Sequence, residues 1–201
     1  MKLTGIILAA GESRRMGSPK ALLDLGGEIF LDRLIDVLGS SCSPVIVVLG
    51  SEAQRIRGGL RNAGRASFVL NPDYARGQLS SLQCGLAAVP VDADGVMFMP
   101  VDKPAVLGSS IAAIARRFEE RKPGELLVVP RAGGRNGHPV LVSRELVQQL
   151  LALPHHAQAR DVIHGHVQET VYLDVDDAGV LDDVNDPEAY AQLKARWGNT
   201  V

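Results

Sequence analysis

Short, continuous apolar runs alternate with helical patterns along this chain of 201 residues. The runs lack the alternation of a half-exposed strand, which is typical of strands buried on both faces of a parallel sheet. They predict strands at residues 5–8, 45–49, 67–70, 96–99 and 126–129. Apolar residues three and four apart predict helices around residues 30–38, 111–118, 146–151 and 187–197. This order predicts one α/β domain over residues 1–201, a three-layer, Rossmann-like sandwich with a mostly parallel sheet.

Two later segments depart from this rhythm. Residues 131–138 are rich in turn-forming residues and predict a flexible β-connection that projects over the site. Residues 167–181 contain Asp-Asp-Ala-Gly and predict a β-hairpin or two short strands. The last helix has a clear start, because Asp186 suits the N-cap and Pro187 suits the first helical position.

The loop after the first apolar run has the composition of a phosphate-binding site. Its sequence, LAAGESRRMGSPK, joins small residues to three cations, namely Gly11, Ser13, Gly17, Arg14, Arg15 and Lys20. Glycine lets the backbone approach a ligand, and N–H groups and cations offset the charge of phosphate oxygens. The glycine spacing excludes a Walker A loop and a GxGxxG dinucleotide loop. The alternative is an ordinary strand-to-helix loop with surface arginines.

A candidate metal ligand follows the apolar run at residues 96–99. Asp102 comes just after this run, and ligands of open parallel sheets bind outside the carboxyl ends of the strands. A carboxylate there suits Mg²⁺, which takes oxygen ligands and usually bridges to substrate phosphates. The alternative is that Asp102 caps the next turn. The basic loop elsewhere in the chain favours the metal.

Composition and charge narrow the function classes. The net charge is −2, so no general basic field indicates nucleic acid. Cys42 and Cys84 lie far apart, so neither a disulfide framework nor a zinc knuckle is expected. The N-terminus has the pattern of a first strand rather than of a signal peptide, and no apolar stretch reaches the roughly 18 residues of a membrane span. A cytoplasmic location is therefore expected.

Residues 155–166 contain two histidine pairs. His155 and His156 are adjacent, and one residue separates His164 from His166. Such pairs invite a zinc hypothesis, but no acidic or cysteine cluster nearby completes a ligand set. The histidines are therefore interpreted as solvated surface.

The loop LAAGESRRMGSPK closely resembles the signature LAAGxSxRMGxxK of the MobA-like nucleotidyltransferases, and is most similar to that of the molybdenum cofactor cytidylyltransferases. The resemblance covers nearly the whole chain. It implies a fold like that of nucleotide-diphospho-sugar transferases, with Mg²⁺ as the cofactor. Arg15, Lys20 and Asp102 are the implied catalytic residues. The implied nucleotide contacts are Leu8, Ala9, Ala10, Gly11, Ser13, Arg14, Arg15, Lys20, Asn71, Gly77 and Ser81.

Two further segments carry the resemblance. In residues 71–82 a glycine precedes a pair of serines and a leucine, as in the family's turn beside the nucleotide base. Ser80 or Ser81 is also expected to cap the helix that follows. Residues 182–188 resemble the family's late Asp-Ile-Asp-Thr-Pro-Glu motif, which makes Asn185 the second metal ligand. Asp183 is left open as a ligand or a surface-turn residue.

Residues 134–140 resemble the Gly-x-x-Gly-His-Pro-Val segment of the cytidylyltransferases. This resemblance implies acceptor contacts from His138 and Arg135, while a purely structural histidine stays open. The Ala159-Arg160 pair is similar to a late Gly-Ala-Arg element, so Arg160 is a further candidate near the acceptor that is not counted among the catalytic residues. Lys103 departs from the family, which often has Gln or Met between the aspartate and the proline.

The resemblance implies transfer of a nucleoside monophosphate, CMP from CTP, to a phosphate-bearing acceptor of the molybdopterin type, with release of pyrophosphate. Arg15 and Lys20 would stabilise the departing pyrophosphate. Two alternatives stay open: nucleotidyl transfer to a sugar 1-phosphate or an alcohol phosphate, and non-catalytic delivery of a cofactor. A molybdoenzyme or its chaperone is left open as a protein partner, and neither nucleic acid nor a membrane is expected.

Overall fold

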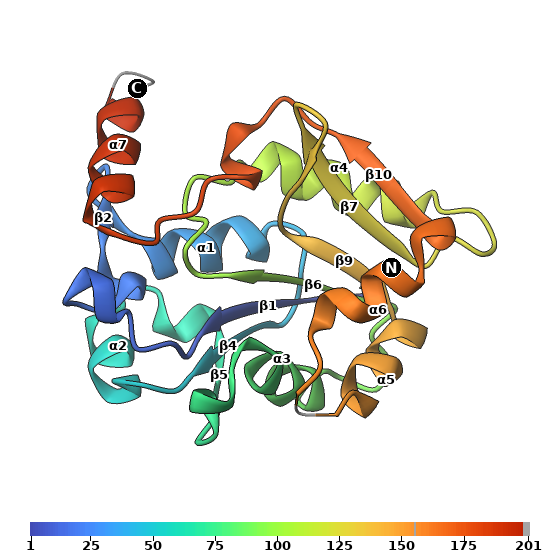
Figure 1. Ribbon diagram of the computed structural model, residues 1–201, viewed down its shortest axis with the longest axis horizontal. Helices are drawn as coiled ribbons and strands as arrows, with labels where there is room; N and C mark the ends of the chain where they lie inside the picture. The colour runs from blue at the N-terminus through green and yellow to red at the C-terminus, as the bar shows by residue number, and fades with distance from the viewer. Residues whose placement is uncertain (155, 199–201) are drawn as a thin grey trace.

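A mixed, mostly parallel sheet forms the centre of the computed structural model, which describes residues 1–154 and 156–198 (Figure 1). The strand order is β10-β7-β9-β6-β1-β4-β5, and β8 pairs with β7 outside this row. β9 runs antiparallel to its neighbours β6 and β7, whereas β6, β1, β4 and β5 are mutually parallel, as are β7 and β10. The strands are β1 (Leu3–Ala9), β4 (Val45–Leu49), β5 (Ser67–Leu70), β6 (Gly95–Pro100), β7 (Leu127–Ala132), β8 (Arg135–Asn136), β9 (Val140–Ser143) and β10 (Thr170–Asp174).

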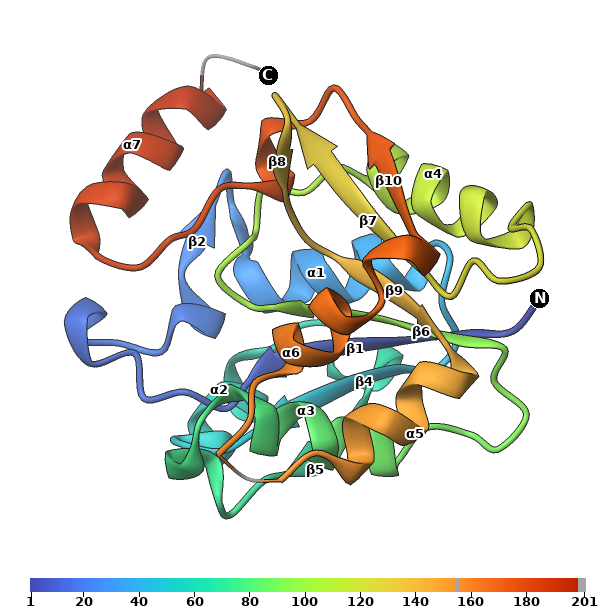
Figure 2. The ribbon, with the colours of Figure 1, turned by 45° about the vertical axis from the view of Figure 1, so that its right-hand side comes forward.

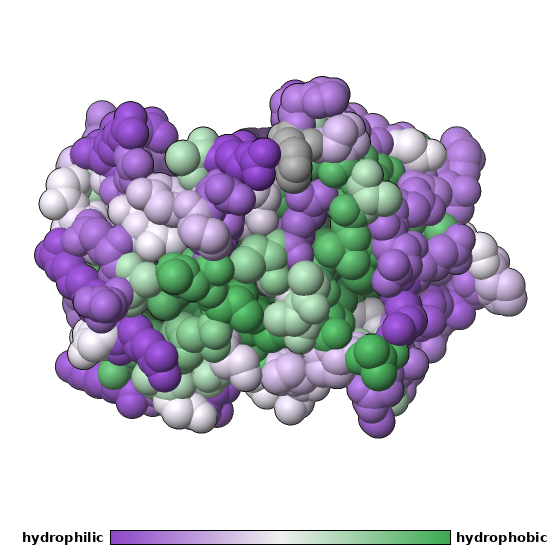
Figure 3. Space-filling view, turned by 90° about the horizontal axis from the view of Figure 1, so that it is seen from below, coloured by the Kyte–Doolittle hydropathy of each residue, from purple (hydrophilic) through white to green (hydrophobic). Residues whose placement is uncertain are grey.

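Helices cover both faces of this sheet, because the strands are apolar on both sides. In β1, Ile7 packs with the helices α1 and α4, and its neighbour Ile6 packs with α3 and α5 on the other face. Seen from the side of α3 and α5, apolar residues gather across the middle of the surface and hydrophilic residues surround them (Figure 3). The helices are α1 (Phe30–Gly39), α2 (Ala53–Gly59), α3 (Gln78–Ala87), α4 (Gly108–Glu119), α5 (Arg144–Ala152), α6 (Ala159–Gly165) and α7 (Pro187–Gly198).

The predicted three-layer α/β sandwich is confirmed. Each of the five predicted strands and four predicted helices is present, with ends shifted by a few residues. The start of α7 is also as predicted, since the Asp186 carboxylate accepts a hydrogen bond from the Ala189 N–H at 2.9 Å. α7 stands beside a small hairpin of β2 (Asp24–Leu25) and β3 (Glu28–Ile29), where Leu193 and Trp197 pack (Figure 1). Among the described residues, no helix has the length and apolar character needed to cross a membrane.

The prediction of a hairpin at residues 167–181 is wrong. This segment forms the single strand β10, which pairs in parallel with β7, and 3₁₀ turns precede and follow it (Figure 2). The Asp-Asp-Ala-Gly sequence suggested a hairpin turn, but the buried Asp177 carboxylate serves α4 instead. It accepts hydrogen bonds from the Leu107 N–H at 3.0 Å and from the Ser110 hydroxyl at 2.7 Å. A long-range contact therefore overrides the local turn signal.

Residues 131–138 form a paired β-hairpin. β7 continues to Ala132, the chain turns at Gly133 and Gly134, both with positive φ, and β8 returns antiparallel (Figure 2). After β8, the Gly137 N–H donates to the Pro130 carbonyl at 2.8 Å. The predicted β-connection is therefore present, and backbone hydrogen bonds fix both of its arms.

Candidate active site

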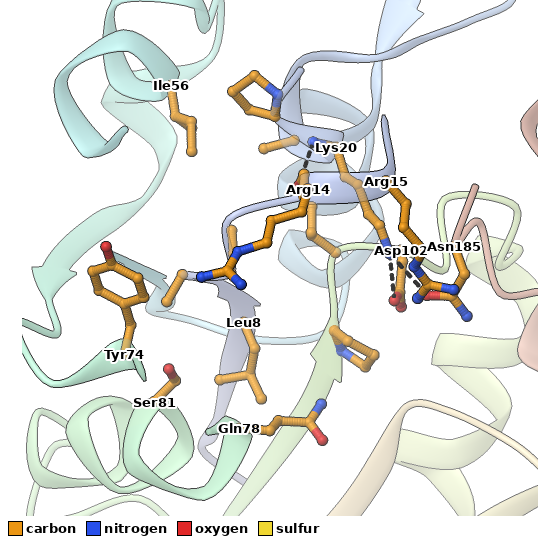
Figure 4. Close-up of a pocket in the computed structure, with 18 of the residues that line it drawn as sticks. Leu8, Arg14, Arg15, Lys20, Ile56, Tyr74, Gln78, Ser81, Asp102 and Asn185 are labelled. Atoms are coloured by element: carbon orange, nitrogen blue, oxygen red, sulfur yellow. Dashed lines mark hydrogen bonds and ion pairs between the residues drawn. The ribbon is translucent and has the colours of Figure 1, made fainter. Parts of the chain in front are cut away.

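The carboxyl ends of β1 and β6 lie side by side and open into a cavity of about 370 Å³ (Figure 4). The basic loop leaves β1 at this edge, and Asp102 follows β6 at the same edge. The segments from Tyr74 to Ser81 and from Asn185 complete the wall. Predicted site residues that line the cavity are Leu8, Ala9, Ala10, Gly11, Ser13, Arg14, Arg15, Lys20, Gly77, Ser81, Asp102 and Asn185.

The basic loop is folded back on itself by Ser13. This residue has φ 51° and ψ 33°, a left-handed conformation that few residues other than glycine adopt. Its carbonyl accepts from the Met16 N–H at 2.9 Å, and its hydroxyl accepts from the Lys20 N–H at 3.0 Å. Gly17, with φ 68°, completes the turn. The strained serine therefore joins the start of the loop to Lys20, which brings the lysine over the cavity.

Lys20 joins the two predicted metal ligands. Its ammonium lies 3.3 Å from Asp102 Oδ2 and 2.8 Å from Asn185 Oδ1, so both oxygens converge on one point (Figure 4). Asp102 Oδ1 is buried and has no hydrogen-bond partner among the described residues. An orphaned carboxylate oxygen and an amide oxygen facing one cation fit the preference of Mg²⁺ for oxygen ligands. The donor set therefore fits a divalent ion that takes its remaining ligands from phosphates and water.

Two arginines extend over the cavity from the same loop. Both are exposed, and Arg14 forms an ion pair with Glu12. The Arg14 side chain reaches across the cavity toward Leu8, while Arg15 runs beside Lys20 toward Asn185 (Figure 4). Their guanidinium groups are therefore placed to bind phosphate oxygens from the open side.

The wall opposite the basic loop is a turn closed by Asn71. The Asn71 amide donates to the hydroxyls of Ser80 and Ser81 at 3.0 Å each, and its carbonyl oxygen accepts from the Asp73 N–H at 2.9 Å. Asn71 is buried and does not line the cavity. The predicted serine N-cap is wrong, because α3 begins at Gln78 and both serines lie within its first turn. Their hydroxyls are used to close this turn.

Gly77 has a backbone conformation that only glycine adopts easily. Its φ is 106° and its ψ is −178°, and a Cβ there would meet nothing within 4 Å. We expect Gly77→Ala to lower the free energy of unfolding by about 1–3 kcal/mol because of this strain. Gly11→Ala is the matched control: its φ is not positive and the space beside it is open. We expect Gly11→Ala to change stability by less than about 0.5 kcal/mol but to weaken nucleotide binding.

Urea unfolding and nucleotide titration calorimetry measure the two effects. Equal stability of the Gly77→Ala and Gly11→Ala proteins would show that Gly77 is not needed for its backbone conformation.

A second cavity, of about 640 Å³, adjoins the first and shares Leu8, Gly77, Gln78 and Pro100 with it. His138 lines its wall. Burial, together with the nearby Lys103 cation, lowers the pKa of His138 to about 4. The imidazole is therefore neutral at pH 7 and can donate through one nitrogen and accept through the other.

The other wall of the second cavity is α6 and the segment before it. Arg160, His156 and His164 are exposed on this wall. His156 and His164 are exposed, as predicted, but they face a cavity. The prediction is wrong for His166, which is half-buried with its Nε2 2.9 Å from Gln149 Oε1, and His155 lies outside the described residues. The start of α6 could have been predicted from its capping box, in which Gln158 and Asp161 serve as the two capping residues. Arg135, in contrast, is exposed on β8 and lines neither cavity.

Comparison with protein families identifies the family of this chain. The family described as MobA-like NTP transferase domain matches residues 5–171. This chain belongs to that family.

The curated relatives of similar sequence differ in the nucleotide and in the reaction that their names state. The Escherichia coli molybdenum cofactor cytidylyltransferase is 28% identical over 193 residues, 96% of this chain and 95% of that protein. The molybdenum cofactor guanylyltransferase of Cereibacter sphaeroides is 33% identical over 159 residues, 76% of this chain and 77% of that protein. The nicotine blue oxidoreductase of Paenarthrobacter nicotinovorans is 31% identical over 153 residues, 72% of each chain. Membership therefore does not by itself choose the base or the reaction.

One similar solved structure is a complex with manganese. The crystal structure of Rv0371c from Mycobacterium tuberculosis in complex with manganese superposes with a TM-score of 0.78 at 26% identity, and covers 97% of this chain and 99% of that one.

Proposed function

We propose that this protein transfers CMP from CTP to a phosphate group on a molybdopterin-type acceptor and releases pyrophosphate. The observation that carries the proposal is the meeting of two cavities at the ends of β1 and β6. The first contains a basic loop, Lys20 and an oxygen ligand pair, and the second adjoins it through Pro100, two residues before Asp102. We infer that the first cavity holds the triphosphate and the second holds the acceptor, and that the two sites meet at Leu8, Gly77, Gln78 and Pro100.

In the proposed reaction, a phosphate oxygen of the acceptor attacks the α-phosphorus of CTP. The new P–O bond forms as the bond from the α-phosphorus to the bridging oxygen breaks, and that electron pair leaves with pyrophosphate. Asp102 and Asn185 would hold Mg²⁺, which when bound neutralises phosphate charge. Lys20 and Arg15 bind the departing pyrophosphate, and the walls hold the two substrates in line. No covalent intermediate with the protein is required.

The choice of CTP rests on two observations. The loop has Leu8-Ala9-Ala10-Gly11, which resembles the loop of the cytidylyltransferases, whereas the guanylyl-transferring members of the family tend to have Leu-Ala-Gly-Gly. Similarity to the E. coli cytidylyltransferase also extends along 96% of the chain, further than similarity to the guanylyltransferase. Cys42 and Cys84 are both free thiols, which suits the reducing cytoplasm proposed as the location.

Pyrophosphate release tests the proposal directly. The protein is incubated with Mg²⁺ and with CTP, GTP, UTP or ATP, each with and without a molybdopterin-type acceptor. Release with CTP that depends on the acceptor is expected. Release with GTP and with no other nucleotide would show that GTP, not CTP, is the donor. Release with a sugar 1-phosphate or an alcohol phosphate would show that this compound, not a molybdopterin-type compound, is the acceptor. Because one relative is named an oxidoreductase, the protein is also incubated with a reduced nicotinamide dinucleotide. Oxidation of this dinucleotide without any pyrophosphate release would contradict the proposal.

The α6 wall of the second cavity gives a second testable expectation. We expect Arg160→Gln to raise the KM for the acceptor by about tenfold, the effect of losing one charge-assisted hydrogen bond, and to leave the KM for CTP unchanged. Arg135→Gln is the matched variant, since Arg135 was predicted from the sequence as an acceptor contact but lies outside both cavities. Steady-state kinetics with each substrate varied compare the two. A larger effect at Arg135 would show that the β7–β8 hairpin, not α6, binds the acceptor.

A further inference from the structure

Lys103 is a buried cation between the two cavities. Only 5% of it is exposed, and its ammonium lies 2.7 Å from Asp183 Oδ1 and 3.4 Å from the Leu181 carbonyl. Lys103 follows Asp102 of the first cavity, and its charge acts on His138 of the second. Burying an ammonium is costly unless it is paired. This position therefore calls for a role that an ordinary surface lysine does not have.

The ion pair ties the segment that carries Asn185 to the end of β6. Asp183 lies two residues before Asn185, and between them the Val184 N–H donates to the Asp102 carbonyl at 2.9 Å. The backbone bond fixes one point of the segment. The Lys103–Asp183 pair fixes a second point, which limits rotation of the segment about the first.

The charges of the same pair act on His138 in the wall of the second cavity. The backbone N–H of His138 donates to the Val180 carbonyl at 2.9 Å, so the position of His138 depends on the same C-terminal segment. A Cβ on the preceding residue, Gly137, would meet the Val180 carbonyl oxygen at 2.5 Å, which shows how closely the segment of His138 packs against the segment of Val180. A change at Lys103 can therefore reach both cavities.

We propose that Lys103 is a positioning residue: through Asp183 it holds residues 181–185 so that Asn185 faces Asp102 and Lys20. The proposal rests on the proposed function for the role of the metal. In this chain a lysine stands between the aspartate and the proline, where the family motif that this segment resembles often has Gln or Met. Lys103 itself lines neither cavity.

The test uses Lys103→Met, which keeps the length of the side chain and removes its charge, and Asp183→Asn, which keeps the lysine. Lys2→Met is the matched control, because Lys2 also pairs with an aspartate, Asp92 at 2.5 Å, but on the exposed surface away from both cavities. Mn²⁺ binding is followed by electron paramagnetic resonance on the whole protein with a non-hydrolysable CTP analogue. The His138 imidazole is titrated separately by nuclear magnetic resonance, without metal or nucleotide.

Both changes at the pair are expected to weaken Mn²⁺ binding by about tenfold, the usual effect of losing support for a metal ligand, while Lys2→Met has no effect. The His138 pKa is expected to rise from about 4 toward its usual 6.5 in Lys103→Met and to fall in Asp183→Asn, because the two charges act on it in opposite directions. A general loss of stability would not produce opposite shifts. Unchanged Mn²⁺ binding and unchanged His138 pKa values would overturn the proposal. Failure of the unaltered protein to bind Mn²⁺ would overturn the metal site of the proposed function, and the role of Lys103 toward it.

Discussion

Replacing Asp102 with asparagine is expected to abolish turnover and leave the fold intact. The substitution removes the only negative charge of the proposed ligand pair, and a metal ion contributes several kcal/mol to stabilising a phosphoryl-transfer transition state, so kcat should fall by at least about 10³-fold. Stability should change little. The carboxylate pairs with Lys20 at one oxygen, and its other, buried oxygen has no partner in the described residues, so the charge gains little from folding. Pyrophosphate release and thermal unfolding measure the two quantities.

Asp36→Asn is the control for this variant. Asp36 is a half-buried carboxylate on α1 that pairs with Arg65 and accepts from Asn62, and it lines neither cavity. It should keep full activity, and both variants should unfold within about 2 °C of the unaltered protein. An Asp102→Asn protein that turns over at the normal rate would remove Asp102 from the metal site. One that unfolds far below the control would make the carboxylate structural.

The sequence could predict this site because its main parts lie at the ends of buried strands. Lys20 and Asp102 are 82 residues apart, but both follow continuous apolar runs, and parallel strands bring their carboxyl ends to one edge. The loop needed only local information, since its glycines and cations are adjacent along the chain. Asn185 came from the late motif, and the structure brings it to the same ammonium.

Other parts of the site depend on contacts that no local pattern encodes. Lys103 looked like a substitution in a motif, and its partner Asp183 looked like a surface-turn residue, yet they form a buried pair. Residues 155–166 looked like solvated surface, because exposed polar side chains on a cavity wall have the same pattern as those on a free surface. Arg135 was favoured by its motif, but successive side chains of β8 point to opposite faces, so that Asn136 lines the second cavity and Arg135 lines neither. For Lys103 and for residues 155–166, the surroundings depend on which distant segment of the chain packs against them.

Replacing Lys20 with methionine is expected to have two effects of opposite sign. Turnover should fall by about 10²–10³-fold, the usual loss when a group that stabilises transition-state charge is removed. Binding of Mn²⁺ without nucleotide should become tighter, because the ammonium lies 3.3 Å and 2.8 Å from the oxygens that the ion needs. Repulsion between such a cation and a metal ion a few ångströms away is about 1 kcal/mol per unit charge in water, or about 2 kcal/mol for a divalent ion, so the dissociation constant should fall by up to about 30-fold.

This pair of effects separates a role for Lys20 in the reaction from a merely structural one. A methionine that only disturbed the loop would weaken metal and nucleotide binding together, whereas removal of a competing cation strengthens the first. Lys194→Met is the control, since Lys194 faces Asp24 on the exposed surface and lines neither cavity. Single-turnover kinetics and Mn²⁺ titration give the two readouts. A Lys20→Met protein with only a doubled KM would mean that the lysine meets no charge in the transition state. Unchanged Mn²⁺ affinity would mean that the ammonium leaves Asp102 and Asn185 before any metal arrives.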